Sequence, residues 1–209
     1  MDVLIILIAA FGAGVLNTIA GGGTFLTFPA LVFVGMPPVI ANATSAVAVF
    51  PGYLSGALGF RDELRQFNRR QMGKLLAVTF VGGLVGALLL LVSSDKAFSA
   101  VVPFLLLAAT LAFLFGDQIR TWAARHSGGV TPYGTMGLFA VSVYGGYFNG
   151  GIGIILLSLL SGLGYRDMLV MNGLKNVLSA LLSLVAAGTF IAAGLISWEH
   201  ALPMAIASA

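Results

Sequence analysis

The sequence predicts an all-α protein, a polytopic bundle of transmembrane helices made of two pseudo-symmetric repeats with glycine-broken segments. Three observations predict this fold. The 209 residues are 59% hydrophobic and only 8% charged, with a mean hydropathy of +1.04, whereas soluble domains are about half apolar and a quarter charged. Apolar runs long enough to cross about 30 Å of hydrocarbon as helix recur along the chain. Finally, glycines interrupt two apolar segments at corresponding places in its two halves.

Six such runs are the predicted spans, and the alternating pattern of a membrane β-barrel is absent from them. They cover residues 3–19, 39–59, 75–92, 98–116, 133–148 and 168–195. The first run is not expected to be a cleaved signal peptide, because Met1 and Asp2 provide no basic segment before it.

The first interruption is the run of glycines at residues 21–23, inside an apolar stretch that extends from residue 3 to residue 35. Each glycine lowers helix stability by about 1 kcal/mol, so three in succession predict a break. Two geometries fit: a single crossing with an unwound kink, or a re-entrant hairpin whose two half-helices meet at the glycines. We favour the hairpin, which gives the two repeats opposite orientations, whereas a kinked crossing makes them parallel.

The second half repeats the order of the first at an offset of about 130 residues. Gly23 falls near Gly153, Asn42 on Asn172, and Ser45 on Lys175. We therefore expect a first transmembrane repeat at 1–116, a cytoplasmic linker at 117–131 and a second repeat at 132–209. The second repeat contains fewer spans than the first, so we expect further spans from a longer chain or from a partner.

Charge and composition exclude several other classes of protein. Basic residues concentrate in two loops, 61–74 and 120–125, which the positive-inside rule places in the cytoplasm. The net charge of +3 therefore reflects membrane topology, and we expect no nucleic-acid partner. Cysteine is absent, and His126 and His200 have no partners at metal-ligand spacing. We expect no metal, no cofactor and no catalytic site, so the protein is not expected to be an enzyme.

Lys175 is the candidate centre of a binding site. Of the ten Lys and Arg and seven Asp and Glu residues, only Lys175 lies well inside a predicted span, about two helical turns from its start. A charge near the bilayer centre costs roughly 2.5–3.5 kcal/mol on insertion scales. No acidic residue lies at a comparable depth to neutralise this charge, so we expect an anionic substrate to pair with it. The alternative is that the long side chain reaches back to the cytoplasmic surface.

The glycine breaks point to the same chemistry. A helix that begins after Gly23 or Gly153 presents free N–H groups and a partial positive charge, which bind anions. The alternatives are interhelical hydrogen bonding for the asparagines and close helix packing for the glycines; for the pairs Gly52/Gly56 and Gly82/Gly86 we expect packing. The predicted substrate-binding residues are Asn17, Thr18, Gly21, Gly22, Gly23, Thr24, Asn42, Thr44, Ser45, Asn149, Gly150, Gly151, Gly153, Asn172, Lys175 and Asn176.

The motifs of both halves resemble the sulfite exporter TauE/SafE family over essentially the whole chain. In the first half they are NTIAGGGT at 17–24, PAL at 29–31, GMPP at 35–38 and ANATSA at 41–46; in the second they are GGYFNGGIG at 145–153 and NGLKN at 172–176. The resemblance implies a secondary transporter that moves small sulfur-containing anions, such as sulfite, sulfonates or sulfoacetate, by alternating access.

We expect the transporter to lie in a bacterial inner membrane and to be coupled to a proton or a sodium ion. An anion channel and a carrier of non-sulfur organic anions are the alternatives. The direction of transport and the formation of a homodimer are left open.

Overall fold

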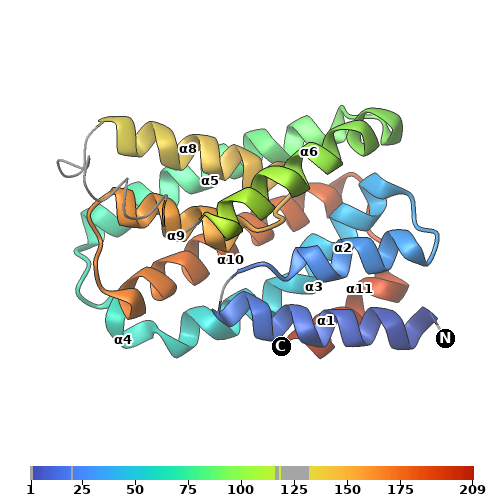
Figure 1. The fold of residues 1–209 in the computed structure, drawn as a ribbon, viewed down its shortest axis with the longest axis horizontal. Helices are drawn as coiled ribbons and strands as arrows, with labels where there is room; N and C mark the ends of the chain where they lie inside the picture. Colours follow the sequence, from blue (N-terminus) through green and yellow to red (C-terminus); the bar gives the residue numbers. More distant parts are fainter. Residues whose placement is uncertain (1, 20, 116–117, 119–131) are drawn as a thin grey trace.

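The computed structural model describes residues 2–19, 21–115, 118 and 132–209. Helices make up the regular structure of these residues, so the predicted all-α fold is confirmed. Most of the helices lie along the long axis of the bundle (Figure 1). They are α1 (Asp2–Ile19), α2 (Thr24–Phe33), α3 (Pro38–Gly59), α4 (Arg61–Leu64), α5 (Arg69–Leu91), α6 (Asp95–Leu114), α8 (Pro132–Tyr147), α9 (Ile152–Gly162), α10 (Met168–Ala192) and α11 (Trp198–Ser208).

Each of the six predicted spans corresponds to one helix where its residues are described. The largest difference between predicted and observed bounds is at the start of α5. This helix begins at Arg69, ahead of the predicted residue 75. The Asn68 side chain accepts a hydrogen bond from the Gln71 backbone N–H at 2.8 Å, and the Gln71 side chain accepts one from the Asn68 N–H. This capping box starts the helix among charged residues, which hydropathy alone placed outside the span.

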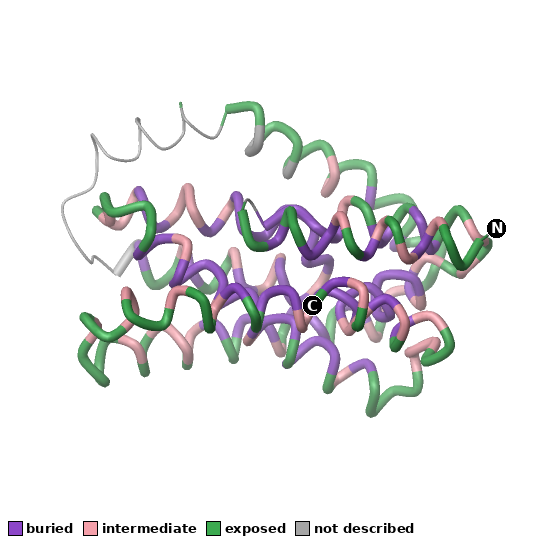
Figure 2. Tube along the Cα trace, turned by 90° about the horizontal axis from the view of Figure 1, so that it is seen from below, coloured by how far each residue is buried: buried purple, intermediate pink, exposed green. Residues whose placement is uncertain are grey.

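Three described helices, α1, α5 and α10, are long and apolar enough to cross a membrane. They differ in how deeply they are buried. Of the most apolar 18-residue stretch of α10, 67% is buried inside the bundle, whereas only 28% of the corresponding stretch of α1 is buried. The outward face of α1 carries large exposed apolar side chains at helical spacing, Leu4, Ile8, Phe11 and Val15. Figure 2 shows such exposed segments around a buried centre. An apolar exterior of this kind suits a lipid environment.

The predicted linker 117–131, with its basic residues 120–125, lies outside the described residues except for residue 118. The domain boundaries at 116 and 132 therefore stay predictions.

Glycines allow the close approach of α5 and α8. A Cβ atom on Gly86 would lie 2.0 Å from the Val143 carbonyl oxygen, and one on Gly146 would lie 2.1 Å from the Gly83 carbonyl oxygen. One on Gly82 would lie 2.6 Å from the Cβ of Ser142. Only a residue without a side chain fits at such positions. The packing predicted for Gly82 and Gly86 is confirmed.

We expect Gly86→Ala to lower the stability of the protein, because the added methyl group meets backbone atoms that cannot move aside. Overpacking of this kind costs roughly 1–3 kcal/mol. The measurement is the thermal unfolding midpoint of the purified protein in detergent.

Gly73→Ala is the matched control on the same helix, since a Cβ there meets nothing within 4 Å and alanine favours helix. Equal midpoints for the two variants would contradict the proposed packing.

Candidate functional site

The chain reverses direction at two interruptions, one in each half. Helix α1 ends at Ile19 and α2 begins at Thr24; α8 ends at Tyr147 and α9 begins at Ile152. In both cases the second helix runs back beside the first (Figure 1). The turns use left-handed backbone, with φ of +81° at Gly21, +66° at Gly151 and +60° at Asn149. Glycine and asparagine are the residues that tolerate this conformation.

The two turns contact each other through their backbones. The Gly153 N–H donates a hydrogen bond of 3.1 Å to the Gly21 carbonyl oxygen. A Cβ atom on Gly21 would lie 2.4 Å from the Gly153 Cα, so the approach requires glycine. The structure thus brings together segments from opposite halves of the chain, and the first turns of α2 and α9 begin at this contact.

The Lys175 side chain is fully buried in α10, and its ammonium group contacts the last turn of α1. The three protons of its Nζ are shared among four acceptors: the carbonyl oxygens of Asn17, Thr18 and Ile19 at 3.2, 3.1 and 3.3 Å, and Asn172 Oδ1 at 3.1 Å. The last carbonyl groups of a helix lack helical partners and carry partial negative charge. Lys175 therefore caps α1, and the alternative that it reaches the cytoplasmic surface is wrong.

A reciprocal contact joins α3 to the end of α8. The Asn42 side-chain amide donates to the carbonyl oxygen of Tyr147, the last residue of α8, at 2.9 Å. Three residues further on, the Ser45 hydroxyl forms a hydrogen bond with Thr27 of α2. The long helix of each half therefore caps the interrupted helix of the other half.

The asparagines at the turns are only partly satisfied. Asn17 Oδ1 accepts from the Gly23 N–H at 2.7 Å, and Asn149 Nδ2 donates to the Ser183 hydroxyl at 2.8 Å. Asn17 Nδ2, Asn149 Oδ1 and the Thr24 hydroxyl are buried and have no partner among the described residues. An unpaired buried polar atom costs about 1–3 kcal/mol, and such atoms mark places where a polar ligand or water gains most by binding.

Three of the predicted site residues point elsewhere. Thr44 accepts a hydrogen bond from the Ser197 N–H at 3.1 Å, next to α11. The Thr18 side chain is exposed and donates to the Gly14 carbonyl oxygen of its own helix. The Asn176 amide lies against α3, since a Cβ on Gly56 would be 2.9 Å from its Nδ2. Only the backbone of Thr18 takes part in the contact with Lys175.

Sequence reasoning missed polar side chains that lie deeper between α3 and α10. Asn176 opposes Gly56 and Gly173 opposes Phe60, and this antiparallel register places Ser179 opposite Tyr53. The hydroxyl groups of Tyr53 and Ser179 are fully buried and have no partner in the described part of the chain. The signal was present in α10, because Asn172, Asn176, Ser179 and Ser183 recur at helical spacing.

The electrostatic character of this region is positive. Lys175 and Asn42 occupy the C-terminal ends of α1 and α8. At the start of α2 the Asn17 side chain accepts from the Gly23 N–H, whereas the N-cap of α9, Gly151, has no side chain. None of the acidic side chains that the structure describes is buried. Three or more potential metal ligands do not gather anywhere in the described ranges. The Gly23 and Gly153 N–H groups are already paired, with Asn17 Oδ1 and the Gly21 carbonyl oxygen. The arrangement can therefore attract an anion through the partial positive charge of the helix starts and through the ammonium.

Comparison with known proteins identifies relatives over nearly the whole chain. Residues 6–209 match the family model "Sulfite exporter TauE/SafE". A "Probable membrane transporter protein" of Haemophilus influenzae is 31% identical over 207 residues, which cover 95% of this chain and 78% of the relative.

Two further relatives carry similar names. The "Probable membrane transporter protein ORF9" of a Sinorhizobium species is 28% identical over 201 residues, which cover 95% of this chain and 76% of the relative. The "Probable membrane transporter protein YfcA" of Escherichia coli K12 is 29% identical over 146 residues, covering 69% of this chain and 54% of the relative. No solved structure shows a significant match.

We expect Gly21→Ala to destabilise the contact between the two turns. Alanine at a φ of +81° is strained by about 1–2 kcal/mol, and its methyl group would meet the Gly153 backbone. The thermal unfolding midpoint in detergent should fall by several degrees.

Gly188→Ala provides the control, because this glycine lies in α10 with nothing within 4 Å of its Cβ position. If Gly21→Ala were as stable as Gly188→Ala, the close approach of the turns would be wrong.

Proposed function

The chain belongs to the sulfite exporter TauE/SafE family, and from this membership we propose that it is a secondary transporter of small sulfur-containing anions such as sulfite, sulfonates or sulfoacetate. The family match and the names of the relatives identify a membrane transporter. The class of substrate, the coupling and the mechanism are the proposed part.

The observation that carries the proposal is the backbone contact between Gly21 and Gly153, with α2 and α9 beginning beside it. Each helix N-terminus is equivalent to about half a positive charge. The Lys175 ammonium lies against the last turn of α1, just before Gly21 in the chain. An oxyanion accepts several hydrogen bonds at once and therefore suits such a cluster of donors. The unpaired Asn17 Nδ2 and Thr24 hydroxyl supply further donors.

Binding of an anion would also alter the contact that holds α1. The Lys175 protons are directed to three α1 carbonyl groups and to Asn172. An anion that reaches the ammonium competes with those carbonyl groups and so weakens the cap of α1. A ligand that favours one arrangement of α1 over another shifts the population between them. We propose this competition as the link between substrate binding and alternating access.

The repeats are proposed to be inverted, as the hairpin geometry requires. Helix bounds support the offset: α1 (2–19) shifted by 130 gives 132–149, beside α8 at 132–147, and α3 (38–59) shifted by 130 gives 168–189, beside α10 at 168–192. In Figure 1, α1 and α8 run in opposite directions along the long axis, as do α3 and α10. The reciprocal caps of α1 and α8 support the same relation. Rocking of one repeat against the other around a central site is how such folds transport.

We place the protein in a bacterial inner membrane, crossing it several times, with a proton or a sodium ion as the coupling ion. The three relatives are bacterial, and the basic loop between α3 and α5 fits the cytoplasmic side.

Counterflow of labelled sulfite and sulfonates in proteoliposomes tests the proposed function. We expect saturable exchange by the wild-type protein and a loss of at least about tenfold in Lys175→Gln, which removes the charge. Glutamine is preferred to alanine, because it keeps a donor for the α1 carbonyl groups.

Lys96→Gln is the control, since this lysine is exposed at the start of α6. Wild-type exchange in Lys175→Gln would refute the anion site, and flux without counterflow would indicate a channel.

The topology is tested by labelling single cysteines, which a cysteine-free chain allows without further changes. Gln66, between α4 and α5, and Ser94, between α5 and α6, are both exposed. Because one span separates them, Gln66→Cys should label from the cytoplasmic side and Ser94→Cys from the opposite side. Labelling of both from one side would show that α5 does not cross the membrane.

A further inference from the structure

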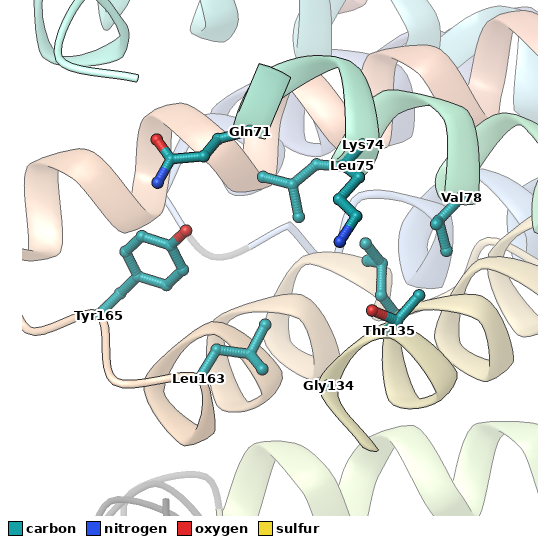
Figure 3. A pocket seen from close by; sticks show the side chains of 9 residues that line it. Gln71, Lys74, Leu75, Val78, Gly134, Thr135, Leu163 and Tyr165 are labelled. Atoms are coloured by element: carbon teal, nitrogen blue, oxygen red, sulfur yellow. The ribbon is translucent and has the colours of Figure 1, made fainter. Parts of the chain in front are cut away.

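A cavity of about 80 Å³ lies between the first turns of α5 and α8 and the loop that follows α9. It is separate from the contact between the two turns, and none of the predicted substrate-binding residues lines it. Figure 3 shows its side chains. The proposed transport mechanism leaves this cavity without a role.

Four polar side chains line the cavity, and one of them carries a positive charge. Its polar residues are Gln71 and Lys74 of α5, Thr135 of α8 and Tyr165 of the α9–α10 loop. The Lys74 amine points toward α8, and the Tyr165 hydroxyl points toward Gln71 (Figure 3). Lys74 forms no ion pair with any residue that the structure describes. Partial burial raises the pKa of Tyr165, so its hydroxyl stays protonated and can donate a hydrogen bond.

The remainder of the cavity wall is apolar. Leu75, Val78, Leu138 and Leu163 line it, and two of these lie deeper along their helices than the polar residues. Val78 comes one turn after Lys74 in α5, and Leu138 comes one turn after Thr135 in α8. The polarity therefore changes along the helix axes, from polar at the helix starts to apolar toward the middle of the predicted spans.

This gradient identifies the chemistry of the ligand. A small hydrated anion would gain the Lys74 contact but nothing from a wall of leucine and valine, and burying it there would cost hydration. A neutral hydrocarbon would fill the wall but gain nothing from the charge of Lys74, which is exposed. An amphiphile with an anionic head and an acyl chain satisfies both ends. Basic pockets between transmembrane helices at the cytoplasmic surface bind anionic lipid headgroups in this way.

The charge around the cavity supports an anionic head. Arg69 and Arg70 are exposed in the first turn of α5, directly before the lining residues Gln71 and Lys74. The positive-inside rule places this end of α5 at the cytoplasmic leaflet, where anionic lipids attract basic residues.

We propose that this cavity is a binding site for an anionic phospholipid of the cytoplasmic leaflet, with the phosphate beside Lys74 and Tyr165 and an acyl chain against Val78 and Leu138. The lipid would bridge α5 of the first repeat and α8 of the second, which already pack through their glycines.

Native mass spectrometry of the purified protein in neutral detergent tests the site, with phosphatidylglycerol and phosphatidylcholine of identical acyl chains as probes. The wild-type protein should retain phosphatidylglycerol more strongly than phosphatidylcholine. Lys74→Gln should lower phosphatidylglycerol retention about fivefold, whereas Lys96→Gln, at the exposed start of α6, should leave it unchanged. Val78→Phe should lower it by filling the apolar end while Lys74 stays in place, and unfolding midpoints confirm that each variant is folded.

The proposal is overturned if folded Lys74→Gln and Val78→Phe both retain phosphatidylglycerol as the wild type does, or if the two lipids bind equally. Glycerol 3-phosphate distinguishes a lipid from a free phosphate ester. If it displaces the lipid at equal concentration, the site recognises the phosphate group alone and the lipid is not its ligand; failure to displace it supports the role of the acyl chain.

Discussion

An interrupted helix at membrane depth must find partners for its freed backbone groups inside the protein, because lipid offers none, and in this chain several of those partners come from the opposite half. Lys175 of α10 donates hydrogen bonds to the last carbonyl groups of α1, and Asn42 of α3 donates one to the last residue of α8. The Gly153 N–H donates a hydrogen bond to the Gly21 carbonyl oxygen. These contacts therefore join the interruption in each half to a helix or turn of the other half.

The same contacts explain why a buried lysine is tolerated, and they are compatible with the anion binding that we propose. An ammonium among helix C-terminal carbonyl groups is paired with partial charges rather than with a fixed carboxylate. Each of these hydrogen bonds is individually modest, so an oxyanion can replace them. A carboxylate at this position would bind the lysine more tightly and would repel the anion. The partners that stabilise the interruption are therefore also ones that the proposed substrate would displace.

Composition and local pattern were enough to predict the helices, but they did not predict every residue of the candidate site. Apolar runs of span length led to helices with nearly the right bounds, and only the capping box at Asn68 moved a boundary by more than a few residues. Lys175 was identified because a charge inside an apolar run is costly wherever the helix lies. Thr44 was assigned to the site because it lies between Asn42 and Ser45, yet the helical rotation turns it toward Ser197. Tyr53 was missed because a tyrosine in an apolar span is ordinary until its hydroxyl is found buried without a partner.

The sequence by itself determined that the protein is helical, that it belongs in a membrane, where its chain is interrupted, and which family it resembles, because these follow from composition, glycine runs and short motifs. Tertiary structure alone decided what each polar group touches. Lys175 contacts the carbonyl groups of α1, Gly21 contacts Gly153, and Lys74 and Tyr165 line one cavity. Each of these relations joins segments far apart in the chain. No local pattern contains them, since they depend on how the helices cross and on which face each one turns toward its neighbour.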